Sequence, residues 1–117
     1  MHGLGELEGK VMDVLWGADR PLRVRDVLEH LDTARPLAYT TVMTVLDNLH
    51  GKGWVHRERD GRAYAYLPAR SREEAGAQLL REVLESSGNA ERVLLHFAES
   101  ATERESELLR KVFGEDR

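Results

Sequence analysis

Apolar residues recur at the spacing of one helix face in three stretches of the N-terminal half of the chain. The stretches run from Leu4 to Gly17, from Val24 to Asp32 and from Leu37 to Lys52. The second and third repeat at i, i+3, i+4 and i+7, and the first has apolar residues at 4, 7, 11, 14 and 15. Pro36 disfavours helical backbone at the residue before it, so the second helix must end before the turn at 33–36. The pattern predicts three helices, with the last two forming a helix-turn-helix.

The residues that follow predict a β-hairpin. Two β-prone runs, 54–59 and 63–67, flank Asp60-Gly61, and Asp-Gly between such runs indicates a type I′ turn. The segment 20–22, before the second helix, is expected to be an extended connector. A hairpin directly after a helix-turn-helix is typical of the wing of a winged helix-turn-helix domain.

From Ser71 onward the pattern is helical again. Two S/T-x-x-E capping boxes, at Ser71 and at Thr102, each predict the start of a helix. The residues 86–89 interrupt the helical pattern between them and offer a cap for the helix that follows, 90–98. These short helices carry too much apolar surface to stand alone and too few residues for a separate core, so we expect a second copy to cover them. The expected dimerisation residues are Leu80, Val83, Leu84, Leu94, Phe97, Leu108, Leu109 and Val112.

The fold class that we predict is mostly α with a small β-hairpin. A winged helix-turn-helix domain would occupy residues 1–70 and a helical dimerisation region residues 71–117. Basic and acidic side chains are equal in number in residues 1–70, so the net charge of −4 belongs to residues 71–117. The overall acidity therefore leaves the N-terminal part free to carry a local basic face.

Composition narrows the cellular setting. The chain has no cysteine, no apolar run near the roughly 20 residues of a membrane span and no secretory signal pattern at its start. We expect a cytoplasmic protein without a membrane partner.

No group of residues indicates catalysis or a cofactor. A cysteine nucleophile is excluded by composition, and neither G-x-G-x-x-G nor a P-loop occurs. We therefore expect no enzyme, no catalytic residue, no cofactor and no metal ligand. The histidines lack the spacing of metal ligands, although a metal-sensing cluster in the folded chain stays open as an alternative; they are His2, His30, His50, His56 and His96.

Residues able to contact DNA gather around the third helix. Hydroxyl-bearing and flat side chains occupy the side of this helix opposite its apolar face, where they can meet base edges and thymine methyl groups. Basic residues at the start of the second helix and on the hairpin can hold phosphates or enter the minor groove. The expected DNA-binding residues are Arg23, Arg25, Tyr39, Thr40, Thr41, Met43, Thr44, Lys52, Arg57, Arg59 and Arg62.

Two other classes of function remain open at this point. The third helix of a winged-helix module could dock a protein groove instead of DNA, a reading that the acidic net charge favours. Alternatively, the chain could be a repressor that responds to a small ligand or a metal.

Three segments resemble the penicillinase-repressor family, BlaI/MecI. They are L-x-x-L-E-x-x-V-M-D-V-L-W (Leu4 to Trp16), A-Y-T-T-V-M-T-V-L-x-x-L-x-x-K-G (Ala38 to Gly53) and G-R-A-Y-x-Y-x-P (Gly61 to Pro68). The form of the second segment is most similar to actinobacterial members. The resemblance covers nearly the whole chain and is most specific in its first seventy residues.

The resemblance implies a homodimeric repressor that binds double-stranded DNA with an inverted repeat of the TACA/TGTA type. In β-lactam-responsive members a membrane sensor protease system cuts an Asn–Phe bond in the dimerisation region. The equivalent position here is His96-Phe97, so His96 departs from that pattern. The copper-responsive branch has a cysteine-rich metal motif that this chain lacks.

Overall fold

The structure of the protein is a computed structural model that describes residues 3–114. These residues form two compact units, the first ending at Ala77 and the second beginning at Gln78. In chain order the elements are α1 (Glu6–Gly17), β1 (Leu22–Arg23), α2 (Val24–His30), α3 (Tyr39–Gly51), β2 (Val55–Asp60), β3 (Ala63–Pro68), α4 (Arg72–Ser86), α5 (Ala90–Ser100) and α6 (Glu103–Gly114). The fold is mostly helical, as predicted.

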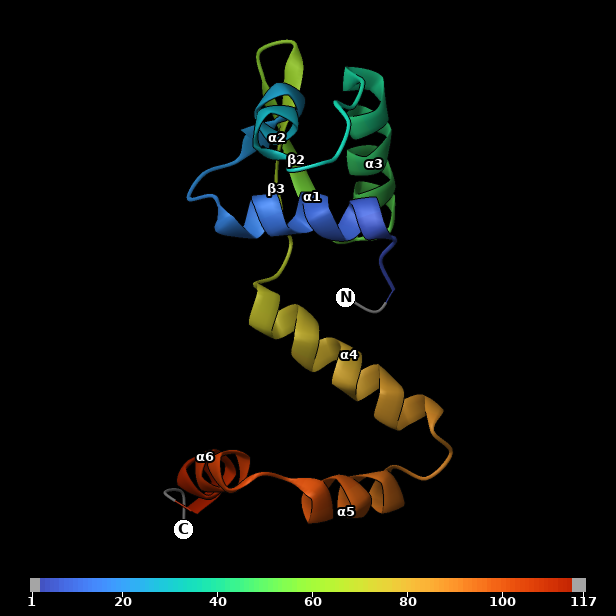
Figure 1. The fold of residues 1–117 in the computed structure, drawn as a ribbon, viewed down its shortest axis with the longest axis vertical. Helices are drawn as coiled ribbons and strands as arrows, with labels where there is room; N and C mark the ends of the chain where they lie inside the picture. Colours follow the sequence, from blue (N-terminus) through green and yellow to red (C-terminus); the bar gives the residue numbers. More distant parts are fainter. Residues whose placement is uncertain (1–2, 115–117) are drawn as a thin grey trace. The chain divides into compact units, whose positions relative to one another are not determined.

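The first unit packs α1, α2 and α3 with the β2–β3 hairpin around one core (Figure 1). The apolar faces read from the sequence supply most of this core, because period-3.6 spacing places their side chains on one side of each helix. The β2–β3 hairpin adds Val55 and Tyr66, each 2% exposed. The other buried members of the cluster are Val11, Met12, Leu15, Leu22, Val24, Val27, Val42, Leu46 and Leu49.

The three N-terminal helices are slightly shorter than the apolar pattern suggested. Helix α1 begins at Glu6, where the Gly5 amide donates to Glu8 Oε1 across 2.9 Å. Helix α2 ends at His30 rather than near Asp32. Apolar residues just outside a helix, such as Leu37 before α3, still pack against the core, so the pattern extends beyond the helical backbone.

The hairpin belongs to a three-stranded antiparallel sheet in the order β1-β3-β2. The residues 20–22 were expected to be an extended connector, and Leu22 in addition begins a short strand, β1. Leu22 pairs with Tyr66 and Arg23 with Ala65. A two-residue strand has no alternation to detect in a sequence, and its partner lies more than forty residues further along the chain.

The hairpin turn is centred one residue later than predicted. Asp60 pairs with Ala63 within the ladder, so Gly61 and Arg62 are the two central residues. Gly61 has a φ of +70°, while no non-glycine residue in the described chain has a positive φ. Positive φ at the first central position alone is the pattern of a type II′ turn rather than type I′. Arg62 therefore lies at the tip of the wing.

The start of α4 is fastened to α1 within the first unit. The Ser71 capping box forms as predicted, with both of its hydrogen bonds to Glu74 at 3.0 Å. The indole N–H of Trp16 donates to the Arg70 carbonyl across 2.9 Å. Arg72 pairs with Asp13 at 2.8 Å and lies over the Trp16 ring.

The second unit consists of the remainder of α4 with α5 and α6. The predicted caps form here too: Asn89 accepts from the Arg92 amide at 3.0 Å, and Thr102 and Glu105 exchange both bonds of a capping box. Neither α5 nor α6 has a buried residue. Across the part of the chain that the structure describes, no helix is long and apolar enough to cross a membrane.

Candidate nucleic-acid interface

One side of helix α3 faces away from the core and is exposed. Thr40, Thr41 and Thr44 are exposed, as are Tyr39 and Met43. The core takes Val42, Leu46 and Leu49 from the other side of the same helix. All five predicted α3 residues are thus brought to one solvent-facing surface.

The hydroxyl of Thr44 is already committed as a donor, because Thr44 Oγ1 donates to the Thr40 carbonyl across 2.9 Å. A threonine in a helix commonly makes this bond to the residue four positions earlier. The side chain therefore offers its methyl group and the lone pairs of its oxygen to a ligand, rather than a free hydroxyl proton.

The wing carries two arginines on one face with an aromatic side chain between them. Cross-strand register pairs Arg57 with Tyr66 and Arg59 with Tyr64. The guanidinium carbons of Arg57 and Arg59 lie 4.3 Å and 5.3 Å from the centroid of the Tyr64 ring. Such cation–π contacts hold the arginines along the strand. The register therefore places Arg57, Arg59, Tyr64 and Tyr66 on one face of the hairpin.

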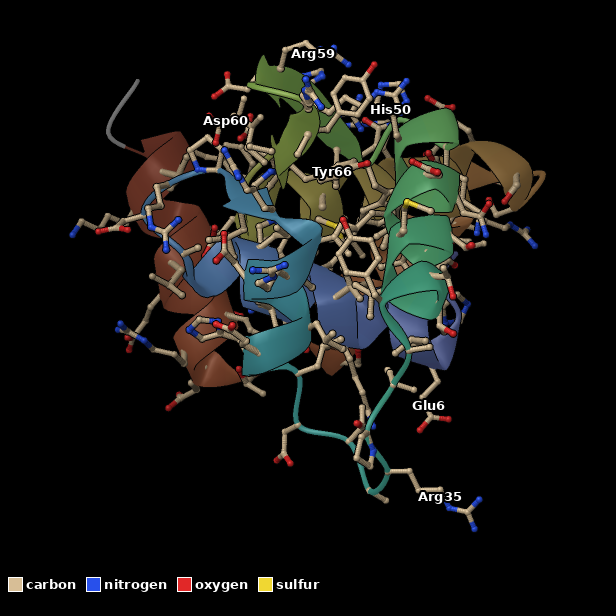
Figure 2. All side chains as sticks on the ribbon, turned by 90° about the horizontal axis from the view of Figure 1, so that it is seen from above. Glu6, Arg35, His50, Arg59, Asp60 and Tyr66 are labelled. Carbon is tan, nitrogen blue, oxygen red and sulfur yellow. The ribbon has the colours of Figure 1, made fainter. Side chains whose placement is uncertain are left out.

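One carboxylate on α3 connects this helix to the wing. Asp47 Oδ1 accepts a hydrogen bond from the Tyr66 hydroxyl at 3.2 Å and lies 3.5 Å from Arg57 Nη1. Figure 2 shows Tyr66 between the wing and α3. Burial raises the pKa of Tyr66, and the charge of Asp47 adds to that rise. Arg57, a predicted phosphate contact, thus has an acidic partner within the protein.

A second acid, Asp60, meets the predicted phosphate contact at the start of α2. Arg23 Nε donates to Asp60 Oδ2 across 2.9 Å, and Arg23 Nη2 donates to the Asp60 carbonyl across 3.1 Å. The hydrogen bond from Arg23 holds the pKa of the Asp60 carboxyl below its ordinary value. Asp60 lies at the end of the wing beside Arg59 (Figure 2).

Lys52, at the C-terminal end of α3, is paired in the same way. Its Nζ lies 2.8 Å from Glu8 Oε1 on α1. This hydrogen bond is the main reason that the pKa of Glu8 is lowered, and the bond from the Gly5 amide adds to it. The pair links the end of α3 to the first turn of α1.

Half of the predicted basic contacts are therefore paired with acids of the same unit, namely Arg23, Lys52 and Arg57. Arg25, Arg59 and Arg62 are exposed and have no ion pair within residues 3–114. The three acidic partners, Glu8, Asp47 and Asp60, were not predicted as part of the site.

Sequence reasoning also missed Asn48. Asn48 is exposed on α3 and follows Thr41 by seven positions and Thr44 by four. This spacing places Thr41, Thr44 and Asn48 on one side of the helix. The Asn48 amide could bond the edge of an adenine. The helical spacing from the threonines was the signal that could have found it.

Among residues 3–114, no group of three His, Cys, Asp or Glu side chains is placed to hold a metal ion. His30 Nδ1 lies 2.7 Å from the Asp26 carbonyl of its own helix, and His50 and His56 are exposed. His2 lies outside the described residues.

The residues expected to form a dimer lie on uncovered surface of the second unit. Seven of the eight are at least 44% exposed, and Leu84 is half-buried. Leu95 and Phe113, which were not in the predicted set, are 57% and 60% exposed on the same helices. His96 and Phe97 lie in the middle of α5, and both are exposed.

A helix-turn-helix followed by a hairpin that carries cations defines the chain as a winged-helix transcription regulator. The family model described as "Penicillinase repressor" matches residues 4–115. The chain belongs to the penicillinase repressor family.

The sequence is also similar to a curated relative. It is 44% identical over 115 residues to the transcriptional regulator BlaI of Mycobacterium tuberculosis, covering 96% of this chain and 83% of that protein. This identity and the family match confirm the resemblance found in the sequence. The relative is a transcription regulator, as expected for a chain in which no enzymatic site was predicted.

Solved structures agree with the fold. The DNA-binding domain of the repressor BlaI covers 62% of this chain, and 87% of that domain is covered, with a TM-score of 0.53 at 24% identity. MepR, a transcription regulator of the Staphylococcus aureus multidrug efflux pump MepA, covers 97% of this chain, with 77% of MepR covered, a TM-score of 0.52 and 16% identity. At these identities the likeness concerns the fold alone.

Proposed function

We propose that this BlaI-type regulator is a homodimer that represses transcription by binding a palindromic operator. The observation that carries the proposal is the exposed face of α3, which bears hydroxyl, aromatic and thioether groups and is flanked by cations of α2 and the wing. The major groove of DNA admits an α-helix, and a helix whose exposed face does not pack on the core is the kind of element that enters it.

In this proposal the five α3 residues Tyr39, Thr40, Thr41, Met43 and Thr44 contact base edges. Arg25 at the start of α2 and Arg59 and Arg62 on the wing, all free of ion pairs within residues 3–114, contact phosphates or the minor groove. Arg23, Lys52 and Arg57 contact phosphates while retaining acidic partners. Phosphate contacts set the register of the protein on DNA, and the α3 contacts supply the sequence preference.

The second unit is proposed to form the dimer. Large side chains such as Leu94, Phe97 and Val112 are 50%, 51% and 62% exposed on helices of only 11 and 12 residues. Isolated helices of this length are marginal in water, and contiguous apolar surface of this kind is usually an interface. A twofold axis through residues 71–113 would supply two α3 helices for the two halves of an inverted repeat.

Release from DNA could follow cleavage in this region. The bond that a sensor protease cuts in β-lactam-responsive members corresponds here to His96–Phe97, in the exposed middle of α5. A cut there would separate Leu94 and Leu95 from Phe97 and the apolar residues of α6, and so weaken the dimer. His96 replaces the asparagine of those members, so this route would require a protease that accepts histidine at that position.

The proposal is tested by fluorescence anisotropy on three duplexes of equal length: a TACA/TGTA inverted repeat, the same duplex with one half scrambled, and a random sequence. Each is titrated over a range of salt concentrations, and sedimentation establishes the oligomeric state. We expect a dimer that binds the complete repeat most tightly. The logarithm of its association constant should fall linearly with the logarithm of the salt concentration.

Two outcomes would overturn it. A protein that stays monomeric at micromolar concentration and binds none of the duplexes at low salt would instead be a protein-interaction module. A protein that prefers the repeat only after a divalent metal is added, with a melting temperature raised by that metal, would be the metal-responsive repressor.

A further inference from the structure

The guanidinium of Arg23 is held by Asp60 along one edge only. Its Nε donates to the Asp60 carboxylate and its Nη2 to the Asp60 carbonyl, at 2.9 Å and 3.1 Å. An arginine has five N–H donors in a fixed fork, so the edge that carries Nη1 keeps its donors. No other hydrogen bond of this guanidinium occurs within the described residues.

This pair joins two elements that flank α3. Arg23 stands at the junction of β1 and α2, and Asp60 ends β2 next to the wing turn. Their side chains are 49% and 55% exposed, so the free edge of the guanidinium is accessible to solvent. An ion pair this exposed contributes little to stability, which leaves orientation of the arginine as its main effect.

Building on the proposed DNA binding, we propose that Asp60 is a positioning residue that aligns Arg23 to donate its free edge to a DNA phosphate. Asp60 itself does not touch DNA in this arrangement. It restricts the rotamers of a long side chain, so less conformational entropy is lost when the phosphate binds. Phosphate oxygens accept two parallel N–H bonds from such an edge.

The alternative is that Asp60 only weakens DNA binding, because its negative charge repels the phosphate backbone. The wing contains a matched control for this effect of charge. Glu58 lies two residues earlier on β2, and strand alternation places it on the same face of the sheet. Glu58 is exposed and has no ion pair within residues 3–114. Glu58→Gln and Asp60→Asn remove the same charge from the same strand, but only the second weakens the hold on Arg23, because it replaces the carboxylate that accepts from Nε with a neutral amide.

The test measures binding to the random duplex and to the TACA/TGTA duplex over a range of salt concentrations, for the full-length protein and four variants. The variants are Arg23→Ala, Asp60→Asn, Glu58→Gln and the Arg23→Ala/Asp60→Asn double variant. Asparagine is a favourable residue near a tight turn, so the Asp60 variant keeps the wing intact. Thermal unfolding of each variant checks the fold.

We expect Arg23→Ala to weaken binding to both duplexes and to reduce the log–log salt slope by about 1 per DNA-binding domain. Asp60→Asn should weaken binding in the same direction, although it makes the protein less acidic, while Glu58→Gln leaves affinity unchanged or raises it. In the Arg23→Ala background, Asp60→Asn should have no further effect.

Tighter binding by Asp60→Asn, in step with Glu58→Gln, would overturn the inference, because Asp60 would then act only as an opposing charge. A loss that persists in the Arg23→Ala background would also overturn it, because Asp60 would then act through the wing and not through Arg23. If the wild-type protein binds the random duplex with a normal salt slope but shows no preference for the repeat, the proposed operator fails while this inference is still tested.

Discussion

Tyr66 on the wing and Asp47 on α3 are joined by a hydrogen bond of 3.2 Å, which the tyrosine hydroxyl donates to Oδ1 of the carboxylate. The Tyr66 ring packs in the core, and only 2% of the residue is exposed. One end of this side chain therefore stabilises the apolar interior while the other fixes the wing against the exposed helix. The same carboxylate lies 3.5 Å from Nη1 of Arg57 on β2, so Asp47 connects α3 to both strands of the wing.

Removing the Tyr66 hydroxyl should lower stability modestly. Tyr66→Phe keeps the buried ring and deletes the donor to Asp47, and a typical intramolecular hydrogen bond contributes about 0.5–1.5 kcal/mol. We expect a loss of this size in the free energy of unfolding, measured with urea. Tyr64→Phe is the control, since the Tyr64 hydroxyl makes no hydrogen bond within residues 3–114. Equal losses in both variants would mean that the Tyr66–Asp47 bond stabilises nothing.

Glu8 should make stability depend on pH in the acid range. Its folded-state pKa is lowered from the ordinary value of 4.5, mainly by the hydrogen bond from Lys52. Between the two pKa values the unfolded chain binds more protons than the folded chain. The stabilisation is therefore present above the ordinary pKa and is lost as the pH falls through the folded value.

Glu8→Gln should accordingly be less stable than the wild type at neutral pH, and the difference should disappear well below the ordinary glutamate pKa. Urea unfolding at a series of pH values measures this convergence. Glu6→Gln is the matched control, because Glu6 lies on the same helix turn and its side chain is 90% exposed. A difference between wild type and Glu8→Gln that stays constant with pH would contradict the prediction.

Thr44 should contribute to sequence preference through its methyl group. The hydroxyl proton already serves the Thr40 carbonyl, so the methyl is the group left to meet a thymine. We expect Thr44→Ala to weaken binding to the inverted repeat by about 1 kcal/mol, roughly fivefold, without weakening binding to random DNA. Thr44→Val, which keeps a methyl at that position, should retain most of the preference. Equal losses on both duplexes in the alanine variant would remove Thr44 from base contact.

A charge placed on the apolar face of α5 should separate the two copies. Leu94 is 50% exposed, and an aspartate there would be desolvated at the proposed interface. We expect Leu94→Asp to sediment as a monomer and to lose its preference for the complete inverted repeat over a single half-site. His96→Asp places the same charge about 200° further round the helix and should remain dimeric. Two dimeric variants would argue against α5 as part of the interface.

Much of the fold was predictable because its signals are local. Three apolar faces at helical spacing gave α1, α2 and α3, and Ser71, Asn89 and Thr102 gave three helix starts through hydrogen bonds to residues three positions away. The β1 strand could not be read in the same way. It exists because Leu22 meets Tyr66, and a pairing across that sequence separation leaves no periodic signal in two residues.

The residue types of the candidate site were also visible in the sequence, but their pairing was not. Arg23, Lys52 and Arg57 are basic residues in suitable positions, which the pattern of elements could indicate. That each meets an acid depends on contacts between elements, from Arg23 to Asp60 and from Lys52 to Glu8, separated by 37 and 44 residues. Only the folded arrangement shows which cations already have partners.

If the proposed dimer covers α5 and α6, which have no buried side chain of their own, the lifetime of each copy would depend on its partner. A chain without a partner has two short helices that open readily, and opened segments are the ones that proteases degrade. Newly made copies at low abundance would be removed faster than paired ones. Turnover would then depend on dose, so that the amount of active protein rises more steeply than its synthesis.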